Sequence, residues 1–246
     1  MKFFSKTLII AYILLSSASA LTFLALKITE KEIKEYVISR MVTPKLNRGN
    51  DKKWANEILK GGYILFFRHA ERDQWLDVAM YDALESNLDH KEKKNFRFAE
   101  KEYFSEAVCL NSRGKIQARA MKEVIEYSGL PIGYSVSSPI CRARQTADIA
   151  FGGYQKLSQN LVYQGPYNEK DNSLNLKNLL LSLPIEEGTN TVISAHNSLV
   201  KCSILKNKFC DLRLDQGGFY VIKKDGQDLK LVYEFNNFND FSRVFF

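Results

Sequence analysis

The sequence predicts an α/β protein, a three-layer α/β/α sandwich built on a mostly parallel sheet. Three short apolar runs, 63–67, 132–136 and 191–195, have the length and composition of buried strands. Segments with helical periodicity lie between them. Strands that alternate with helices form parallel sheets through right-handed crossovers, with helices on both faces. No internal repeat suggests a solenoid or a propeller instead.

The longest predicted helix begins after Ser112, which can serve as its N-cap, and ends near Tyr127 with Gly129 just beyond. We expect its buried face to carry the apolar side chains of Ile116, Ala120, Val124 and Ile125. Three more helices are predicted over 140–150, 174–183 and 198–206.

The remaining elements are a short strand over 157–163 and a closing hairpin. The hairpin pairs 219–223 with 229–235 around the Asp225-Gly226 turn. The polar stretch 73–107 shows no clean period, and we interpret it as an insertion that could cover a site at the end of the first strand.

Composition is that of an ordinary globular chain, with 45% hydrophobic and 26% charged residues, which excludes disordered and collagen-like proteins. The net charge of +7 raises the question of a polyanionic partner. Residues 1–50 hold eight lysines and arginines against three glutamates, so +5 of the excess lies there and only +2 in the rest. The body carries no basic stripe or aromatic ladder, and we expect no nucleic-acid partner.

Residues 1–27 are expected to be a transmembrane anchor or a signal peptide. No charge occurs between Lys6 and Lys27, and about 20 apolar residues suffice to cross a bilayer core. The lysines before this run favour a cytoplasmic N-terminus. Ala18-Ser19-Ala20 resembles a cleavage site, but apolar residues continue beyond it, which favours the anchor. Both interpretations place the body, 51–246, on the periplasmic or extracytoplasmic side, with 28–50 as a juxtamembrane helix and linker.

Four cysteines, Cys109, Cys141, Cys202 and Cys210, form an even number in a compartment expected to be oxidising. Cys202 and Cys210 are close enough in sequence to bridge a helix to its following loop. Their spacing includes no C-x-x-C pair, and three histidines in the whole chain leave little for a zinc site, so no metal is expected. The sequence leaves a structural disulfide, or none, as alternatives.

Chemistry is concentrated where the three predicted strands end. The first ends in Arg68-His69, the second is followed by 137–146 with Arg142, and the third ends at His196. Sites in such sheets form beyond the carboxyl ends of the strands. An arginine fork binds phosphate oxygens in pairs, and histidine can act as nucleophile or proton shuttle near neutral pH.

Four sequence blocks at these positions resemble the histidine phosphatase superfamily, the phosphoglycerate-mutase-like enzymes, in its small branch. They read RHAER at 68–72, LNSRG at 110–114, SSPICRARQT at 137–146 and AH at 195–196. They occur in the family's order across most of the body. Ala70 stands where the family usually has glycine, a departure that we expect to be tolerated. Asn197 stands where the phytase-like branch has aspartate, which disfavours that branch.

The resemblance implies that His69 attacks phosphorus and that Arg68, Arg72 and Arg142 hold the transferring phosphoryl group. It implies that His196 adds a contact to the same group. Phosphoryl transfer depends mainly on positioning and charge neutralisation, which fixed cations supply without a metal or other cofactor. In the blocks, Asn111 and Gly114 are expected to shape the helix entry rather than touch substrate, and Arg144 to be a charge on the helix face.

The leaving group also needs a proton donor. The resemblance points to a carboxylate between the third and fourth blocks, for which Glu169 is the first candidate and Asp171 the alternative. Glu71 is a third candidate. An ordinary exposed loop carboxylate explains Glu169 equally well.

The function expected from these features is an extracytoplasmic phosphatase acting on a phosphorylated small molecule or on a glycan or lipid phosphate. A phosphomutase is the alternative within enzymes, although it needs a phosphorylated donor from the cytoplasm. A catalytically silent phosphate-binding or interaction module of the same fold is the alternative outside enzymes.

Overall fold

The computed structural model describes residues 50–73, 105–162, 169–197, 199–200, 202–205 and 214–246. For 169–171 and 202–203 it describes the backbone alone. The predicted anchor or signal peptide, all of the linker but Asn50, and most of the insertion lie outside the described residues. So does the predicted pairing of Cys202 with Cys210.

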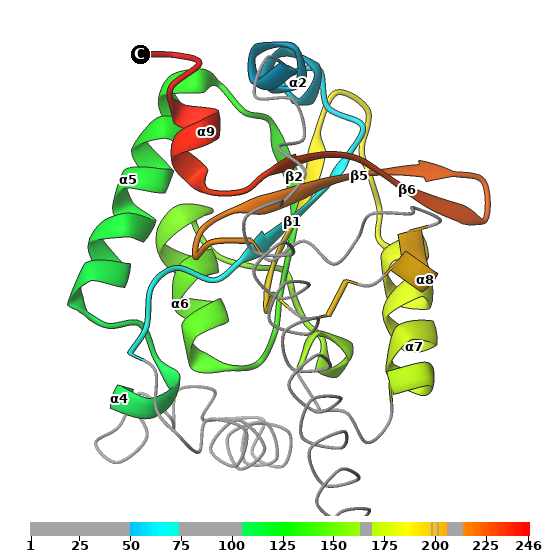
Figure 1. Cartoon of the computed structure of the whole chain (residues 1–246), viewed down its shortest axis with the longest axis horizontal. Helices are drawn as coiled ribbons and strands as arrows, with labels where there is room; N and C mark the ends of the chain where they lie inside the picture. Colours follow the sequence, from blue (N-terminus) through cyan, green and yellow to red (C-terminus); the bar gives the residue numbers. More distant parts are fainter. Residues whose placement is uncertain (1–49, 74–104, 163–168, 198, 201, 206–213) are drawn as a thin grey trace, which may run out of the picture. The chain divides into compact units, whose positions relative to one another are not determined.

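A six-stranded sheet forms the centre of the described body, in the order β3-β2-β4-β1-β5-β6 (Figure 1). Neighbours from β3 to β1 run parallel, whereas β5 is antiparallel to both β1 and β6. The predicted three-layer α/β architecture with a mostly parallel sheet is therefore confirmed. The strands are β1 (Ile64–Arg68), β2 (Ile132–Ser137), β3 (Lys156–Leu157), β4 (Asn190–Ala195), β5 (Phe219–Asp225) and β6 (Asp228–Phe235).

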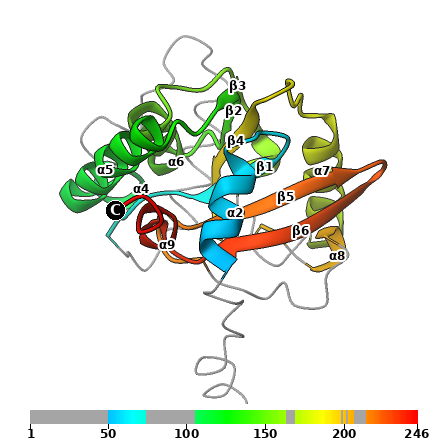
Figure 2. The ribbon, with the colours of Figure 1, turned by 90° about the horizontal axis from the view of Figure 1, so that it is seen from above.

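Helices cover both faces of the sheet, with α5, α6 and α9 on one side and α7 and α8 on the other (Figures 1 and 2). The helices are α2 (Asp51–Ile58), α4 (Ser105–Val108), α5 (Ser112–Ser128), α6 (Cys141–Ala150), α7 (Glu169–Ser182), α8 (Cys202–Leu205) and α9 (Phe238–Ser242), with a 3-10 turn, η3, over Gln159–Leu161.

The two faces of the sheet bury separate apolar clusters, because successive side chains of a strand point to opposite faces. In β1, Leu65 and Phe67 join the cluster under α5 and α9, whereas Ile64 and Phe66 join the one under α7 and α8. The first four residues of β1 are fully buried, which explains why the sequence there is apolar without alternation.

Strand register decides which residues meet at the edge of the sheet. Arg68 of β1 is level with Ala195 of β4, so the next residues of the two strands, His69 and His196, emerge side by side. Ser137 of β2 is level with Ser194 of β4. The adjacent Ser138 thereby reaches the same edge, and its N–H donates to the carbonyl of Ser194 at 2.9 Å.

The structure corrects three details of the helix and strand predictions. The N-cap of α5 is Asn111, whose side chain accepts from the N–H of Gly114 at 2.7 Å, and not Ser112. Its buried face carries Ala118, Met121 and Ile125, while Ile116 is 62% exposed, because these positions and not Ile116 face the sheet. Of the stretch predicted as a strand over 157–163, only Leu157 lies in a strand, β3, and η3 follows at Gln159–Leu161, while residue 163 lies outside the described residues.

Two helices were not foreseen. Helix α2 packs through Trp54, whose ring stacks on Tyr233 at 5.6 Å, and Asp51 accepts a hydrogen bond from the same tyrosine. Helix α9 begins at a capping box formed by Asn237 and Asp240. Among the described residues, no helix has both the length and the hydropathy to cross a bilayer.

Candidate active site

His69 and His196 lie next to each other at the edge of the sheet, as the strand ends predicted. Their ring centroids are 5.4 Å apart and the rings meet edge to face. Each side chain is only 4% exposed. The N–H of His69 continues the ladder by donating to the carbonyl of Ala195 at 2.9 Å, which fixes the two residues relative to each other.

His69 is held in one tautomer. Its Nδ1 lies 2.7 Å from the carbonyl oxygen of Ala70, an acceptor, so Nδ1 carries the proton and donates. Its Nε2 then has a free lone pair, which accepts from Nε of Arg142 at 3.1 Å. Burial above all, and then the charge of Arg142, lower the pKa of His69 well below its usual value. His69 is therefore a neutral imidazole at neutral pH, with Nε2 as its nucleophilic atom.

Arg142 is the cation in direct contact with Nε2 of His69. Its side chain is 3% exposed, at the first turn of α6, and its NH1 reaches the carbonyl of Val108 at 3.5 Å. Arg142, predicted as a phosphate ligand, therefore lies directly beside His69.

Arg68 and Arg72 lie close enough to lower the pKa of both histidines. Arg68 donates from NH1 to the carbonyl of Leu214 at 2.6 Å, and Arg72 donates from NH1 to that of Asp73, also at 2.6 Å. Both side chains are partly buried. The three predicted arginines thus surround the histidine pair, with Arg142 the most deeply buried.

His196 contacts the hydroxyl of Ser138, with Nε2 and Oγ 3.1 Å apart. Its Nδ1 is buried and has no hydrogen-bond partner among the described residues. Burial and then the charge of Arg142 lower the pKa of His196 well below its usual value. A buried nitrogen without a hydrogen-bond partner, close to arginines, is suited to bind a ligand through one of the ligand's oxygen atoms.

The loop that carries His69 is fixed by Thr146 of α6. The hydroxyl of Thr146 accepts from the N–H of Ala70 at 2.9 Å and donates to the carbonyl of Arg142 at 2.8 Å. One side chain therefore connects the loop that carries His69, the predicted nucleophile, to the helix turn that carries Arg142. Ala70 is fully buried in the apolar cluster, so its methyl group is packed and the departure from glycine is accommodated.

The LNSRG block positions the same loop from the other side. Asn111 caps α5 and also donates to Glu71 at 3.2 Å, while a Cβ added to Gly114 would lie 1.9 Å from the carbonyl oxygen of Glu71. The expectation that Asn111 and Gly114 shape the helix entry is confirmed. Gln117 was not foreseen, and its amide bridges the N–H of Glu71 to the carbonyl of Gln216, at 2.9 and 2.7 Å.

Arg144 is not the exposed helix-face charge that the sequence suggested. Its side chain is fully buried, and its Nε donates to the carbonyl of Pro139 at 2.7 Å. Because a helix of a sandwich packs one face on the sheet, this position turns inward and its guanidinium braces the turn after β2. The signal for it was present in the SSPICRARQT block, which places Pro139 five residues before it.

The proton donor stays a prediction. Helix α7 begins at Glu169, and the side chains of Glu169 and Asp171 lie outside the described residues. Glu71, the third candidate, is bound by Arg113 and Asn111, whose hydrogen bonds lower its carboxyl pKa. A carboxyl that stays ionised is a poor acid, so Glu71 is disfavoured.

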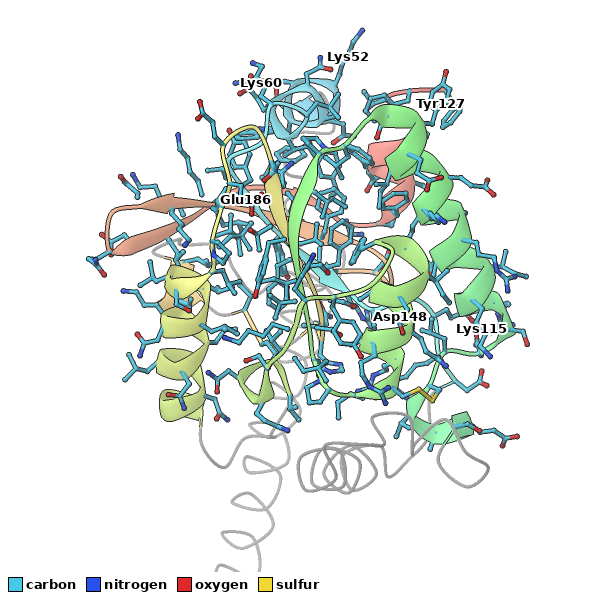
Figure 3. All side chains as sticks on the ribbon, turned by 180° about the vertical axis from the view of Figure 1, so that it is seen from behind. Lys52, Lys60, Lys115, Tyr127, Asp148 and Glu186 are labelled. Carbon is cyan, nitrogen blue, oxygen red and sulfur yellow. A yellow bond between two sulfur atoms is a disulfide. The ribbon has the colours of Figure 1, made fainter. Side chains whose placement is uncertain are left out.

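A disulfide joins Cys109 to Cys141 beside this site, a pairing that the sequence did not identify. It stands next to α4 as the yellow bond in Figure 3. A cavity of about 610 Å³ opens on the same side of the site, with Cys109, Asn111, Lys115 and Gln145 in its lining. Among the described residues, no group of three His, Cys, Asp or Glu side chains is placed to hold a metal ion.

Comparison with solved structures finds similar folds among phosphatases. The protein histidine phosphatase SixA complexed with tungstate matches with 14% identity over 70% of this chain and 95% of its own, at a TM-score of 0.45. The α-ribazole phosphatase from Shigella flexneri matches with 12% identity over 71% of this chain and 97% of its own, at a TM-score of 0.45. Phosphoserine phosphatase from Entamoeba histolytica, in complex with 3-phosphoglyceric acid, matches with 16% identity over 70% of this chain and 95% of its own, at a TM-score of 0.43. No family model and no curated protein sequence matches the chain.

Proposed function

We propose that the chain is a phosphatase that hydrolyses a phosphate ester through a phosphohistidine on His69. One observation carries the proposal: Nε2 of a neutral, buried His69 lies 3.1 Å from the guanidinium of Arg142, beside a second buried histidine. Nucleophile and fixed cation together are what phosphoryl transfer requires. This arrangement of His69 and Arg142 supports the activity, whereas similarity of fold by itself does not imply one.

In the first step, the phosphoryl group enters between the histidines and takes over the donors of Arg142. The lone pair on Nε2 of His69 attacks phosphorus and the ester P–O bond breaks, so that its electron pair leaves on the ester oxygen. That oxygen takes a proton from an acid, for which Glu169 is the proposed source. The proton stays on Nδ1, which continues to donate to the carbonyl of Ala70, and this hydrogen bond stabilises the positive imidazole that forms.

In the second step, the carboxylate left by the first step takes a proton from water, the water oxygen attacks the phosphohistidine, and the P–N bond breaks. Its electron pair returns to Nε2, which restores the neutral imidazole, and inorganic phosphate leaves. Arg68, Arg72 and Arg142 neutralise the charge on the equatorial oxygens throughout, and His196 donates to one of them.

The proposed location is the extracytoplasmic side of a membrane. The uncharged run 7–26 after two lysines supports it, as does the Cys109–Cys141 disulfide, because disulfides persist mainly in oxidising compartments. The substrate proposed there is a phosphorylated small molecule or the phosphate of a glycan or lipid.

Trapping of the intermediate tests the proposal. The body, 51–246, mixed with a ³²P-labelled phosphate ester and quenched in alkali, is expected to retain label that acid releases, the behaviour of phosphohistidine. His69→Ala should abolish labelling and turnover, and Arg142→Ala should lower kcat/KM at least 100-fold. Lys52→Ala, at an exposed position of α2, is the control and should label normally.

Three other outcomes would redirect the assignment. Full turnover by His69→Ala would overturn the mechanism. Phosphate binding without hydrolysis of any ester would favour the catalytically silent module, and transfer of the label to a second substrate rather than to water would favour a phosphomutase.

A further inference from the structure

The disulfide lies between the two backbone segments that flank Arg142. Cys141 is the first residue of α6 and directly precedes Arg142, while Cys109 directly follows Val108. The carbonyl of Val108 is the one that NH1 of Arg142 contacts at 3.5 Å. The Cα atoms of the two cysteines are 4.8 Å apart, although 32 residues separate them in sequence.

Within the described part of the chain, an apolar cluster also joins α4 to α6. Helix α4 has four residues, and its two buried side chains, Ala107 and Val108, share this cluster with the two cysteines. The N–H of Leu110 also donates to Oε1 of Gln145 at 2.9 Å. To these contacts the disulfide adds a covalent constraint that holds the residues around Val108 against the start of α6.

We propose that the Cys109–Cys141 disulfide positions Arg142 for phosphate binding, so that the affinity of the site for phosphate depends on this bond. This inference rests on the proposed function, because it assumes that phosphate binds at Arg142. With the bond intact, Val108 and the start of α6 stay in register, and the guanidinium remains aimed at Nε2 of His69. Without it, the acceptor at Val108 and the helix turn at Arg142 can separate.

Burial protects this disulfide from reduction. Cys141 is fully buried and Cys109 is 3% exposed, so a thiol in solution reaches the sulfurs poorly. A reducing thiol can approach Cys109 through the cavity of about 610 Å³, whose lining includes this residue. Strong reduction is therefore expected to act slowly, and to lower phosphate affinity as it proceeds.

The test compares phosphate binding by the wild-type body and by Cys109→Ala/Cys141→Ala, using isothermal titration with inorganic phosphate. We expect the dissociation constant to rise about tenfold in the variant, at a temperature where circular dichroism shows both proteins folded. Cys202→Ala/Cys210→Ala is the matched control and should bind phosphate as the wild type does.

A coupling measurement separates positioning from general destabilisation. If the disulfide acts through Arg142, its removal in an Arg142→Ala background should change the dissociation constant by less than twofold. Equal affinities of wild type and the Cys109→Ala/Cys141→Ala variant would overturn the inference. So would a tenfold loss that persists in the Arg142→Ala background.

A second measurement applies if the cysteine variant does not fold. The wild-type protein is incubated with dithiothreitol, which gives two electrons and two protons to the disulfide and becomes a cyclic disulfide itself. Phosphate affinity should then fall in proportion to the thiols formed at Cys109 and Cys141, as counted by mass spectrometry after alkylation. Unchanged affinity after complete reduction would overturn the inference.

These outcomes stay separate from those for the proposed function. If the oxidised wild type binds phosphate but hydrolyses no ester, the phosphatase proposal is overturned. The effect of the disulfide on phosphate affinity can still be measured in that case. An oxidised wild type that binds no phosphate would overturn both.

Discussion

Oγ of Ser138 lies 3.1 Å from Nε2 of His196, and this contact determines where the imidazole carries its proton. The hydroxyl of Ser138 accepts from the N–H of Ile140 at 3.3 Å, and both side chains are buried. If Ser138 donates to Nε2, the proton of the neutral ring sits on Nδ1, the nitrogen without a partner. The opposite tautomer would leave two buried groups unsatisfied, the hydroxyl proton and Nδ1. In that tautomer, Nδ1 of His196 carries the N–H that can donate to an anion bound in the site.

Removing this hydroxyl should lower activity through His196. We expect Ser138→Ala to reduce kcat/KM about tenfold, since a lost buried hydrogen bond costs about 1–3 kcal/mol. Ser138→Thr keeps the hydroxyl and should recover most of the loss. Ser182→Ala, which removes a hydroxyl on α7, is the control. Wild-type kinetics with a wild-type pH profile in Ser138→Ala would show that the serine does not set the tautomer.

The hydroxyl of Thr146 should stabilise the protein as well as the site. Thr146→Val keeps the shape but leaves the buried N–H of Ala70 without its acceptor, at a cost of about 1–3 kcal/mol. Urea unfolding should show that loss, together with a lower kcat/KM, because the nucleophile loop is released from α6. Thr146→Ser should behave as wild type. A valine variant with unchanged stability would mean that the loop holds its position without this bond.

Gly114 should tolerate no side chain. A methyl group there would meet the carbonyl oxygen of Glu71 at 1.9 Å, and this atom belongs to the backbone of the nucleophile loop. We expect Gly114→Ala to cost about 1–3 kcal/mol of unfolding free energy and to lower kcat/KM, because the loop must move. Lys122→Ala, at an exposed position of the same helix, should do neither. Thermal melts with parallel assays decide between these outcomes.

Stability should fall as the pH drops through the range in which unfolded histidine titrates. The pKa values of His69 and His196 are lowered in the folded state, chiefly by burial, so the unfolded chain binds more protons below about pH 6.5. The free energy of unfolding should then decrease by up to about 1.4 kcal/mol per pH unit for each histidine. Urea titrations between pH 7.5 and 5.5 measure the slope. His196→Gln should reduce it, and an unchanged slope would contradict the assignment of low pKa values.

The helix and strand pattern could be predicted in most of its parts, because short apolar runs and caps act locally. The strand ending at Arg68-His69 and the helix ending before Gly129 follow from a few neighbouring residues. The predicted buried face of α5 was correct at Ile125 and wrong at Ile116, because a buried face depends on tertiary packing. Ile116 and Ala118 both fit an apolar face in sequence, and only packing against the sheet selects Ala118.

The sequence by itself determined the chemistry available here: two histidines and three arginines at strand ends, in four ordered blocks, with the positive charge of the chain concentrated at its start. Tertiary structure decided how these groups act. The register of β1 and β4 sets His69 beside His196, and the packing of α6 brings Thr146 to Ala70 and Cys141 to Cys109. Such contacts join residues tens of positions apart, and their geometry depends on how the layers pack, which no local pattern encodes.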